Sequence, residues 1–292
     1  MTSSNSNILS RWPTDELLCW ILRGTATIAG AIVLLIVVFL ILEALPALLH
    51  VGLLRFFTDP SWHPAEGFYN LTPMLWGTLF AMTGAVLIAT PLGILSAVFC
   101  HYYAPPILAR SYRCLIELLA GIPSVVYGFW GLVVLVPLIA EIQPPGPSLL
   151  AGILILTIMI LPTIALMADA SLANVPRQYL RGAAALGLPR WATIRGVVFP
   201  AAKSGLFTGV ILETGRAIGE TMAILMVCGN VVQVPSSIFD PIRTLTANIA
   251  LEMAYALGDH RAALFVSGLV LMTMIMALAL AAEWISRGRV YG

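Results

Sequence analysis

The sequence is poor in charged residues and has almost no lysine. Asp, Glu, Lys and Arg make up only 10% of the 292 residues, and Lys203 is the single lysine, whereas a soluble domain typically has about 25% charged residues. The apolar fraction is 60% and the mean hydropathy is +0.96, so the chain cannot cover itself with a water-soluble surface. Its net charge of +1 provides no excess of basic residues, which argues against nucleic acid as a partner.

Motifs for catalysis and metal binding are also missing. A phosphate-binding loop requires G-x-x-x-x-G-K-[ST], but Lys203 follows Ala202. No Ser/His/Asp arrangement or carboxylate pair indicates an active site, so we expect no catalytic residue, no metal and no cofactor, and we expect ATP to be bound by another polypeptide. Four cysteines form no C-x-x-C pair, and we interpret them as packing residues: Cys19, Cys100, Cys114 and Cys228.

Long apolar runs fill most of the chain. A helix needs roughly 20 apolar residues to cross a bilayer core about 30 Å thick. We therefore predict an all-α membrane protein with about six transmembrane helices in a single domain over residues 1–292. The first run exceeds the ~7–15-residue core of a secretory signal, so we expect it to be retained. The expected spans are residues 24–45, 71–101, 115–140, 148–170, 204–229 and 262–285.

The basic residues predict the orientation of these spans. Eleven of the fifteen fall on one side: Arg11, Arg23, Arg110, Arg113, Arg177, Arg181, Arg190, Arg195, Lys203, Arg287 and Arg289. Three fall on the other side, and Arg216 lies within a span. By the positive-inside rule, the N- and C-termini are expected to be cytoplasmic and the loops 46–70 and 230–261 to face outward. The apolar spacing in the second outer loop predicts a short helix that lies at the interface or packs on the bundle.

Three prolines lie within the apolar spans. Pro91, Pro123 and Pro162 each remove a backbone hydrogen bond and are expected to bend a helix. Such bends are typical of a transport pathway, although prolines are also frequent in membrane helices generally.

Two polar residues lie near the ends of the spans. We interpret Asp169 as a snorkelling or capping charge and His101 as an interfacial residue.

The cytoplasmic loop 176–200 is too long for a simple connection. Good helix formers run from Pro176 to Leu186, Gly187 provides a stop, and Pro189 can open a second helix. We expect two short helices lying across the membrane face, with an apolar and basic surface that a cytoplasmic partner could bind.

This loop resembles the coupling motif of ABC importer permeases, which reads EAA, three residues, Gly, nine residues, then I-x-L-P. Gly182 and Ala183 match the two alanines loosely, Gly187 matches the glycine, and the last part of the motif is matched by Val197, Phe199 and Pro200. The resemblance implies that these residues contact an ATPase subunit. Arg181 departs from the pattern because it replaces the usual glutamate.

Three further segments resemble the phosphate-importer permeases of the PstC type: "ELLAGIPSVVYGFWGLVVLVPL", "ILPTIALMADASLANVP" and "GRAIGETMAILMVCGN". This resemblance implies an ABC importer type I permease fold in the cytoplasmic (inner) membrane. It also implies a PstA-type second permease, two ATPase subunits and an extracytoplasmic phosphate-binding protein as partners. A permease for another oxyanion, such as molybdate or sulfate, is the alternative within this class. A secondary transporter is a further alternative, but we find no internal repeat of the kind that such proteins usually show.

Three charges interrupt the fifth span. Glu213, Arg216 and Glu220 lie at i, i+3 and i+7, which predicts one helical face over two turns. An ionised side chain in hydrocarbon costs about 2.5–3.5 kcal/mol on insertion scales, so this face must point into the bundle or its pathway. We interpret Arg216 as a contact for a passing phosphate, oriented by the two glutamates. The alternative is an ion pair that fixes the fifth span to its neighbour.

Overall fold

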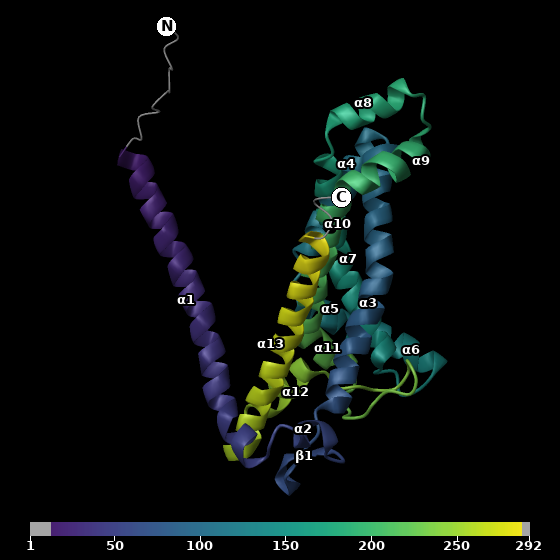
Figure 1. The fold of residues 1–292 in the computed structure, drawn as a ribbon. Helices are drawn as coiled ribbons and strands as arrows, with labels where there is room; N and C mark the ends of the chain where they lie inside the picture. The colour runs from purple at the N-terminus through teal and green to yellow at the C-terminus, as the bar shows by residue number, and fades with distance from the viewer. Residues whose placement is uncertain (1–12, 288–292) are drawn as a thin grey trace.

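A computed structural model describes residues 13–287, which are almost entirely helical (Figure 1). The α-helices are α1 (Pro13–His50), α2 (Arg55–Thr58), α3 (Thr72–Val98), α4 (Pro106–Ala120), α5 (Ser124–Trp130), α6 (Val136–Ile142), α7 (Leu149–Ala173), α8 (Arg177–Ala185), α9 (Arg190–Thr193), α10 (Phe199–Gly219), α11 (Met222–Val227), α12 (Leu245–Glu252) and α13 (Gly258–Arg287). A small antiparallel hairpin pairs β1 (Trp62–His63) with β2 (Phe68–Tyr69), joined by the 3-10 turn η1 (Pro64–Glu66). Three π-helical turns complete the described chain: η2 (Phe99–Tyr103), η3 (Gly131–Leu135) and η4 (Ile194–Val198).

Six helical segments in the described part of the chain are long and apolar enough to cross a membrane, which confirms the all-α membrane fold. They are Glu16–His50, Thr72–Tyr103, Ser124–Ile142, Leu149–Ala173, Arg190–Gly219 and Gly258–Ala281. The start of α1, the end of α13 and helices α8 and α9 lie toward one end of the molecule, and the hairpin lies at the other (Figure 1). The cytoplasmic location of the termini stays a prediction, and two of the basic residues behind it, Arg11 and Arg289, lie outside the described residues.

Two of the predicted spans have wrong boundaries. The expected helix 115–140 is interrupted at Gly121–Pro123, where Pro123 adopts an extended conformation (φ −61°, ψ 141°) before α5 begins. The expected helix 204–229 begins earlier, at Arg190, and its regular part ends at Gly219. Hydropathy alone could not place these ends, because apolar residues continue past each break and the span begins in a basic segment at Arg190. The expected short helix in the second outer loop is confirmed as α12.

The effects of proline differ along the chain. Pro91 and Pro162 lie inside the continuous helices α3 and α7. Pro200 and Pro137 instead each lie two residues after a π-helical turn, η4 and η3. Because proline has no N–H to donate to the carbonyl four residues earlier, a wider turn before it relieves the mismatch.

The core forms where α3 crosses α7. Three buried alanines of α3 and Gly93 recur every four residues, so they lie along one face of the helix: Ala81, Ala85 and Ala89. These small side chains let the two helices approach closely, as is typical of helix pairs in membranes. A Cβ atom added to Gly93 would lie 2.7 Å from Ile164 Cγ2 and 3.3 Å from the backbone nitrogen of Ala165.

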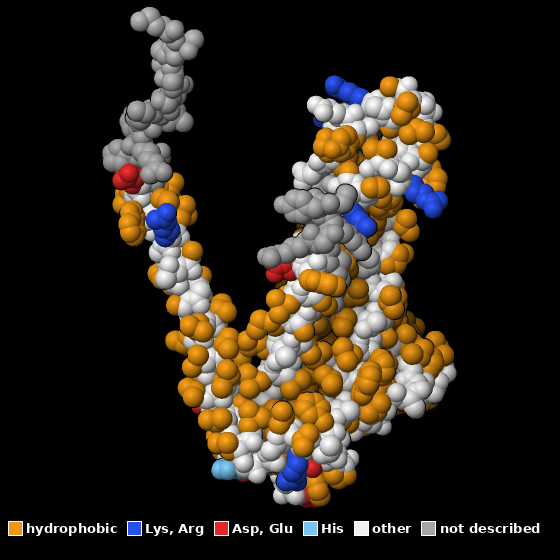
Figure 2. Space-filling view, in the orientation of Figure 1, with side chains coloured by type: hydrophobic (Ala, Val, Ile, Leu, Met, Phe, Trp, Pro, Cys, Tyr) orange, Lys and Arg blue, Asp and Glu red, His pale blue; other side chains and the backbone are white. Residues whose placement is uncertain are grey.

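Among the residues that the structure describes, helix α1 contacts the rest of the chain near its C-terminal end. Ala44 and Ala47 are buried, and the rings of Phe39 and Phe265 meet edge to face at 5.7 Å. Further toward the N-terminus α1 diverges from α13 and its apolar side chains are exposed (Figure 1, Figure 2). Such a surface is stable in lipid, where apolar side chains need no shielding from water.

The four cysteines differ in burial. Cys100 and Cys228 are buried, whereas Cys19 and Cys114 are exposed on the surface of the chain. The interpretation of the cysteines as packing residues is therefore correct for the first two and wrong for the other two.

Replacing Gly93 with valine is expected to destabilise the chain by about 1–3 kcal/mol, because the new side chain would overlap Ile164 and the α7 backbone. The yield of folded protein in the membrane and its apparent Tm in detergent measure this effect. Gly30→Val is the matched control, since a Cβ atom at Gly30 meets nothing within 4 Å. Equal yields and Tm values for the two variants would contradict the close α3–α7 crossing.

Candidate functional site

The loop 176–200 folds as a helix, a turn and the beginning of the fifth span. Helix α8 ends where the backbone N–H of Gly187 donates to the carbonyl of Ala184 (3.0 Å) and that of Leu188 donates to the carbonyl of Ala183 (3.1 Å). Gly187 has φ +71°, a conformation that is costly for residues with a side chain. The second predicted helix exists as α9. It runs through η4 into α10 as one helical segment, so it is not a separate helix lying across the membrane face.

Two faces of this loop have different roles. Ile194 and Val198 are fully buried against α3 and α7, so they anchor the loop to the bundle. Four large apolar side chains are exposed on the loop: Tyr179, Leu186, Leu188 and Trp191. Four arginines are exposed among them: Arg177, Arg181, Arg190 and Arg195. Apolar and basic side chains together form a surface suited to a protein partner.

The motif residues divide between these two faces. Ala183 is buried, Val197 and Phe199 are half-buried, and Arg181, Gly182 and Pro200 are exposed. The motif residues therefore lie on α8, in the turn that follows it, and where η4 joins α10.

The fifth span is broken at Glu220. The backbone leaves the helical conformation there (φ −67°, ψ 129°), and α11 begins two residues later. The Glu220 side chain accepts a hydrogen bond from the backbone N–H of Ala223 (3.1 Å), and the Glu220 carbonyl accepts one from Thr246 Oγ1 (2.8 Å). The expectation that Glu213, Arg216 and Glu220 share one continuous helical face is wrong, because the helix ends between Arg216 and Glu220.

Glu213 and Arg216 remain close to each other on α10. Arg216 Nη1 lies 3.9 Å from Glu213 Oε2, and the Arg216 side chain is 39% exposed. Glu213 is buried, and its Oε2 atom has no hydrogen-bond partner in the described part of the chain. This separation is longer than that of a strong charge-assisted hydrogen bond, about 2.7–2.9 Å. The guanidinium is therefore held near the glutamate and still has donors available for an anion.

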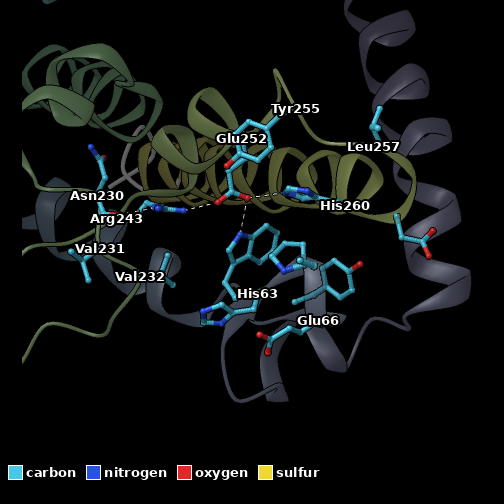
Figure 3. Close-up of a pocket in the computed structure, with 15 residues that line it drawn as sticks. His63, Glu66, Asn230, Val231, Val232, Arg243, Glu252, Tyr255, Leu257 and His260 are labelled. Atoms are coloured by element: carbon cyan, nitrogen blue, oxygen red, sulfur yellow. Dashed lines mark hydrogen bonds and ion pairs between the residues drawn. The ribbon is translucent and has the colours of Figure 1, made fainter.

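A second polar cluster lies at the end of the molecule opposite to α8 and α9 (Figure 3). The buried carboxylate of Glu252 accepts hydrogen bonds from Arg243 Nη1 (2.7 Å) and Trp62 Nε1 (2.9 Å), and it lies 2.9 Å from His260 Nε2. The cluster forms part of the wall of an open pocket of about 850 Å³, which we call the outer pocket. Sequence analysis missed this cluster, since Trp62 lies 190 residues before Glu252 and no local pattern links them.

A third group of charges fastens α4 to α7. Asp169 at the end of α7 pairs with Arg113 Nε on α4 (2.9 Å) and lies 3.3 Å from His101 Nδ1. The interpretation of Asp169 as a snorkelling or capping charge is wrong, because its partners come from two other segments of the chain.

Comparisons with known proteins agree with this architecture. Residues 89–290 match the family described as the binding-protein-dependent transport system inner membrane component. The chain is 39% identical over 277 residues to the probable ABC transporter permease protein YqgH of Bacillus subtilis, covering 92% of this chain and 90% of that protein. It is 37% identical over 249 residues to the phosphate transport system permease protein PstC of Mesorhizobium japonicum, covering 77% and 76% of the two chains.

Solved structures show the same fold at lower sequence identity. A chain of a bacterial alginate ABC transporter superimposes with a TM-score of 0.64 and 14% identity, covering 95% of this chain and 98% of that one. A chain of the MetNI methionine ABC transporter gives a TM-score of 0.58 with 21% identity, covering 75% and 93%. Six apolar helices, the ABC importer permease fold and relatives of the PstC type together show a multi-pass inner-membrane protein, and the chain belongs to the family of binding-protein-dependent transport system inner membrane components.

Proposed function

We propose that this chain is the PstC-type permease subunit of an ATP-driven phosphate importer. Its similarity to PstC of Mesorhizobium japonicum over about three quarters of both chains carries this proposal. The half-exposed guanidinium of Arg216 within a membrane span supports it, since a planar fork of donors suits a phosphate oxyanion. Phosphate would pass Arg216 and then Glu220, at the break that ends α10, while Glu213 limits how tightly the anion binds.

The same proposal assigns the partners. A PstA-type permease would complete the channel, two ATPase subunits would hydrolyse ATP, and an extracytoplasmic phosphate-binding protein would deliver the substrate. The exposed apolar and basic surface of α8 and α9 is the expected contact for an ATPase subunit. In this arrangement the chain itself is not an enzyme, and ATP is bound by its partners.

The charge on Arg216 is the first target for a test. In vesicles with the assembled complex, Arg216→Gln is expected to reduce phosphate uptake by about a hundredfold, the order expected when a charged hydrogen-bond donor to the substrate is lost. Complex yield should fall far less than uptake, because the variant removes a charge from the membrane interior and Arg216 Nη1 is only loosely paired, 3.9 Å from Glu213 Oε2. Uptake and complex yield are measured together, with sulfate and molybdate as competing substrates.

Two further variants separate a pathway role from a structural pair. Glu213→Gln and the double variant Glu213→Gln/Arg216→Gln complete a double-mutant cycle. Recovery of both yield and uptake in the double variant would favour a structural ion pair over phosphate contact. Arg261→Gln is the matched control, because Arg261 is 51% exposed and lies 3.7 Å from Glu43, away from the break. Normal phosphate uptake by Arg216→Gln would contradict the pathway role.

The turn at Gly187 is expected to couple ATP hydrolysis to transport. Valine there would have to adopt φ +71°, which costs roughly 1–2 kcal/mol and would displace the exposed end of α8. Gly187→Val should therefore insert normally but lose phosphate uptake per ATP hydrolysed. Gly196→Val serves as the control, since Gly196 lies outside the left-handed region and a Cβ atom there meets nothing within 4 Å. A normal ratio of uptake to hydrolysis in Gly187→Val would rule out this turn as the coupling element.

A further inference from the structure

Helix α12 is bonded to the broken fifth span at its N-terminal end. Thr246 Oγ1 donates to the carbonyl of Glu220 (2.8 Å), the residue at which α10 has ended. The backbone N–H of Leu245 donates to Thr78 Oγ1 on α3 (3.1 Å). Both Leu245 and Thr246 are buried. The start of α12 is thus fixed to two membrane spans, and one of these bonds satisfies a carbonyl that the break leaves without a helical partner.

At its C-terminal end, α12 is bonded to the wall of the outer pocket. Glu252 is the last residue of α12, and its carboxylate is contacted by three elements: the hairpin through Trp62, the connection after α11 through Arg243, and α13 through His260. These groups line the pocket together with the exposed side chain of Tyr255. Figure 3 shows the contacts converging on Glu252. A molecule that enters this pocket therefore meets groups that hold the end of α12.

A single short helix joins the two ends. Helix α12 has eight residues and is about 12 Å long. Just before it, the carbonyl oxygen of Arg243 approaches α3 so closely that a Cβ atom added to Gly77 would lie 2.8 Å from it. Arg243 also donates from Nε to the carbonyl of Asn230 (2.9 Å). Packed and hydrogen-bonded elements can carry coupling between two sites, so we expect a displacement of Glu252 to shift Thr246 as well.

We propose that Thr246 is a positioning residue for Glu220, and that α12 conveys to it the engagement of the extracytoplasmic binding protein at the outer pocket. The occupant is taken to be the binding protein because this family serves binding-protein-dependent transport and because two elements that line the pocket, the hairpin and the start of α13, lie at the end opposite to α8 and α9 (Figure 1). The role of Glu220 in the pathway rests on the proposed function. Engagement would shift Glu252, and with it the hydrogen bond that holds the Glu220 carbonyl in place.

The test uses the complete complex in nanodiscs, with its ATPase subunits, partner permease and phosphate-loaded binding protein. ATP hydrolysis is measured with and without the binding protein, together with the Kd for the binding protein. Thr246→Val removes the donor to Glu220 at nearly constant volume, together with the contact between Thr246 Oγ1 and Thr244 Oγ1 (3.1 Å) at the start of α12. It is expected to lower the stimulation of hydrolysis about fivefold, the effect of losing the hydrogen bond to Glu220, while basal hydrolysis and Kd stay unchanged. Thr246→Ser keeps the donor and should restore the stimulation.

Two variants control this result. Thr273→Val removes a hydroxyl on α13 that, among the described residues, bonds locally to the carbonyl of Leu269 (2.7 Å), and it should behave like the parent complex. Trp62→Phe removes one donor to Glu252 at the pocket and is expected both to weaken binding of the binding protein and to lower the stimulation.

The outcomes separate this inference from the proposed function. Full stimulation in Thr246→Val would overturn the role of α12, and so would a parallel loss of stimulation, basal hydrolysis and complex yield, which would mark Thr246 as a packing residue. Glu220→Gln in the same assay reports on the pathway. If Glu220→Gln transports phosphate normally, the pathway assignment fails; if it is impaired while Thr246→Val is normal, only the role of α12 fails.

Discussion

Every interruption of a membrane helix must find partners for its backbone groups in protein or in water that lines a cavity, because hydrocarbon offers none. The structure meets this constraint at each break. At Gly121 the chain turns with its N–H bonded to the carbonyl of Glu117 (3.2 Å), and the hydroxyl of Tyr127 donates to the carbonyl of Leu119 (2.8 Å). At Glu220 the carbonyl receives Thr246, and the side chain bonds the first turn of α11. The first role of polar side chains near the breaks is therefore to form hydrogen bonds with backbone groups that the helices leave unpaired.

This constraint changes how buried charges in such a protein are understood. Glu252 and Asp169 each collect donors from two or more segments of the chain, so each fixes the relative position of several elements. Breaking such a cluster would leave a buried charge without compensation, which is strongly destabilising. Arg216 differs from them, because its nearest acid is 3.9 Å away and its side chain is 39% exposed. A residue that is costly to insert and yet incompletely paired is a better candidate for contact with a substrate than a fully bonded one.

Composition and periodicity were sufficient to predict the spans, because long uncharged runs have few alternatives. They also predicted the turn at Gly187, where a residue without a side chain stands at φ +71°. They did not reveal the breaks at Gly121–Pro123 and Glu220, since these depend on partners such as Thr246 that lie far away in the sequence. The cluster around Glu252 was missed for the same reason. The assumption of an unbroken helix also placed Glu220 on a face with Arg216 that does not exist.

The π-helical turn η4, between α9 and α10, bears on how chains of this kind are compared. A π turn holds one residue more than the α-helical turn that it replaces. The loss of one residue from Ile194–Val198 would convert η4 to α-helix and leave the side chains before and after it on their present faces. Alignments of related chains should therefore tolerate a gap of one position here, within a membrane helix, where gaps are otherwise taken as errors.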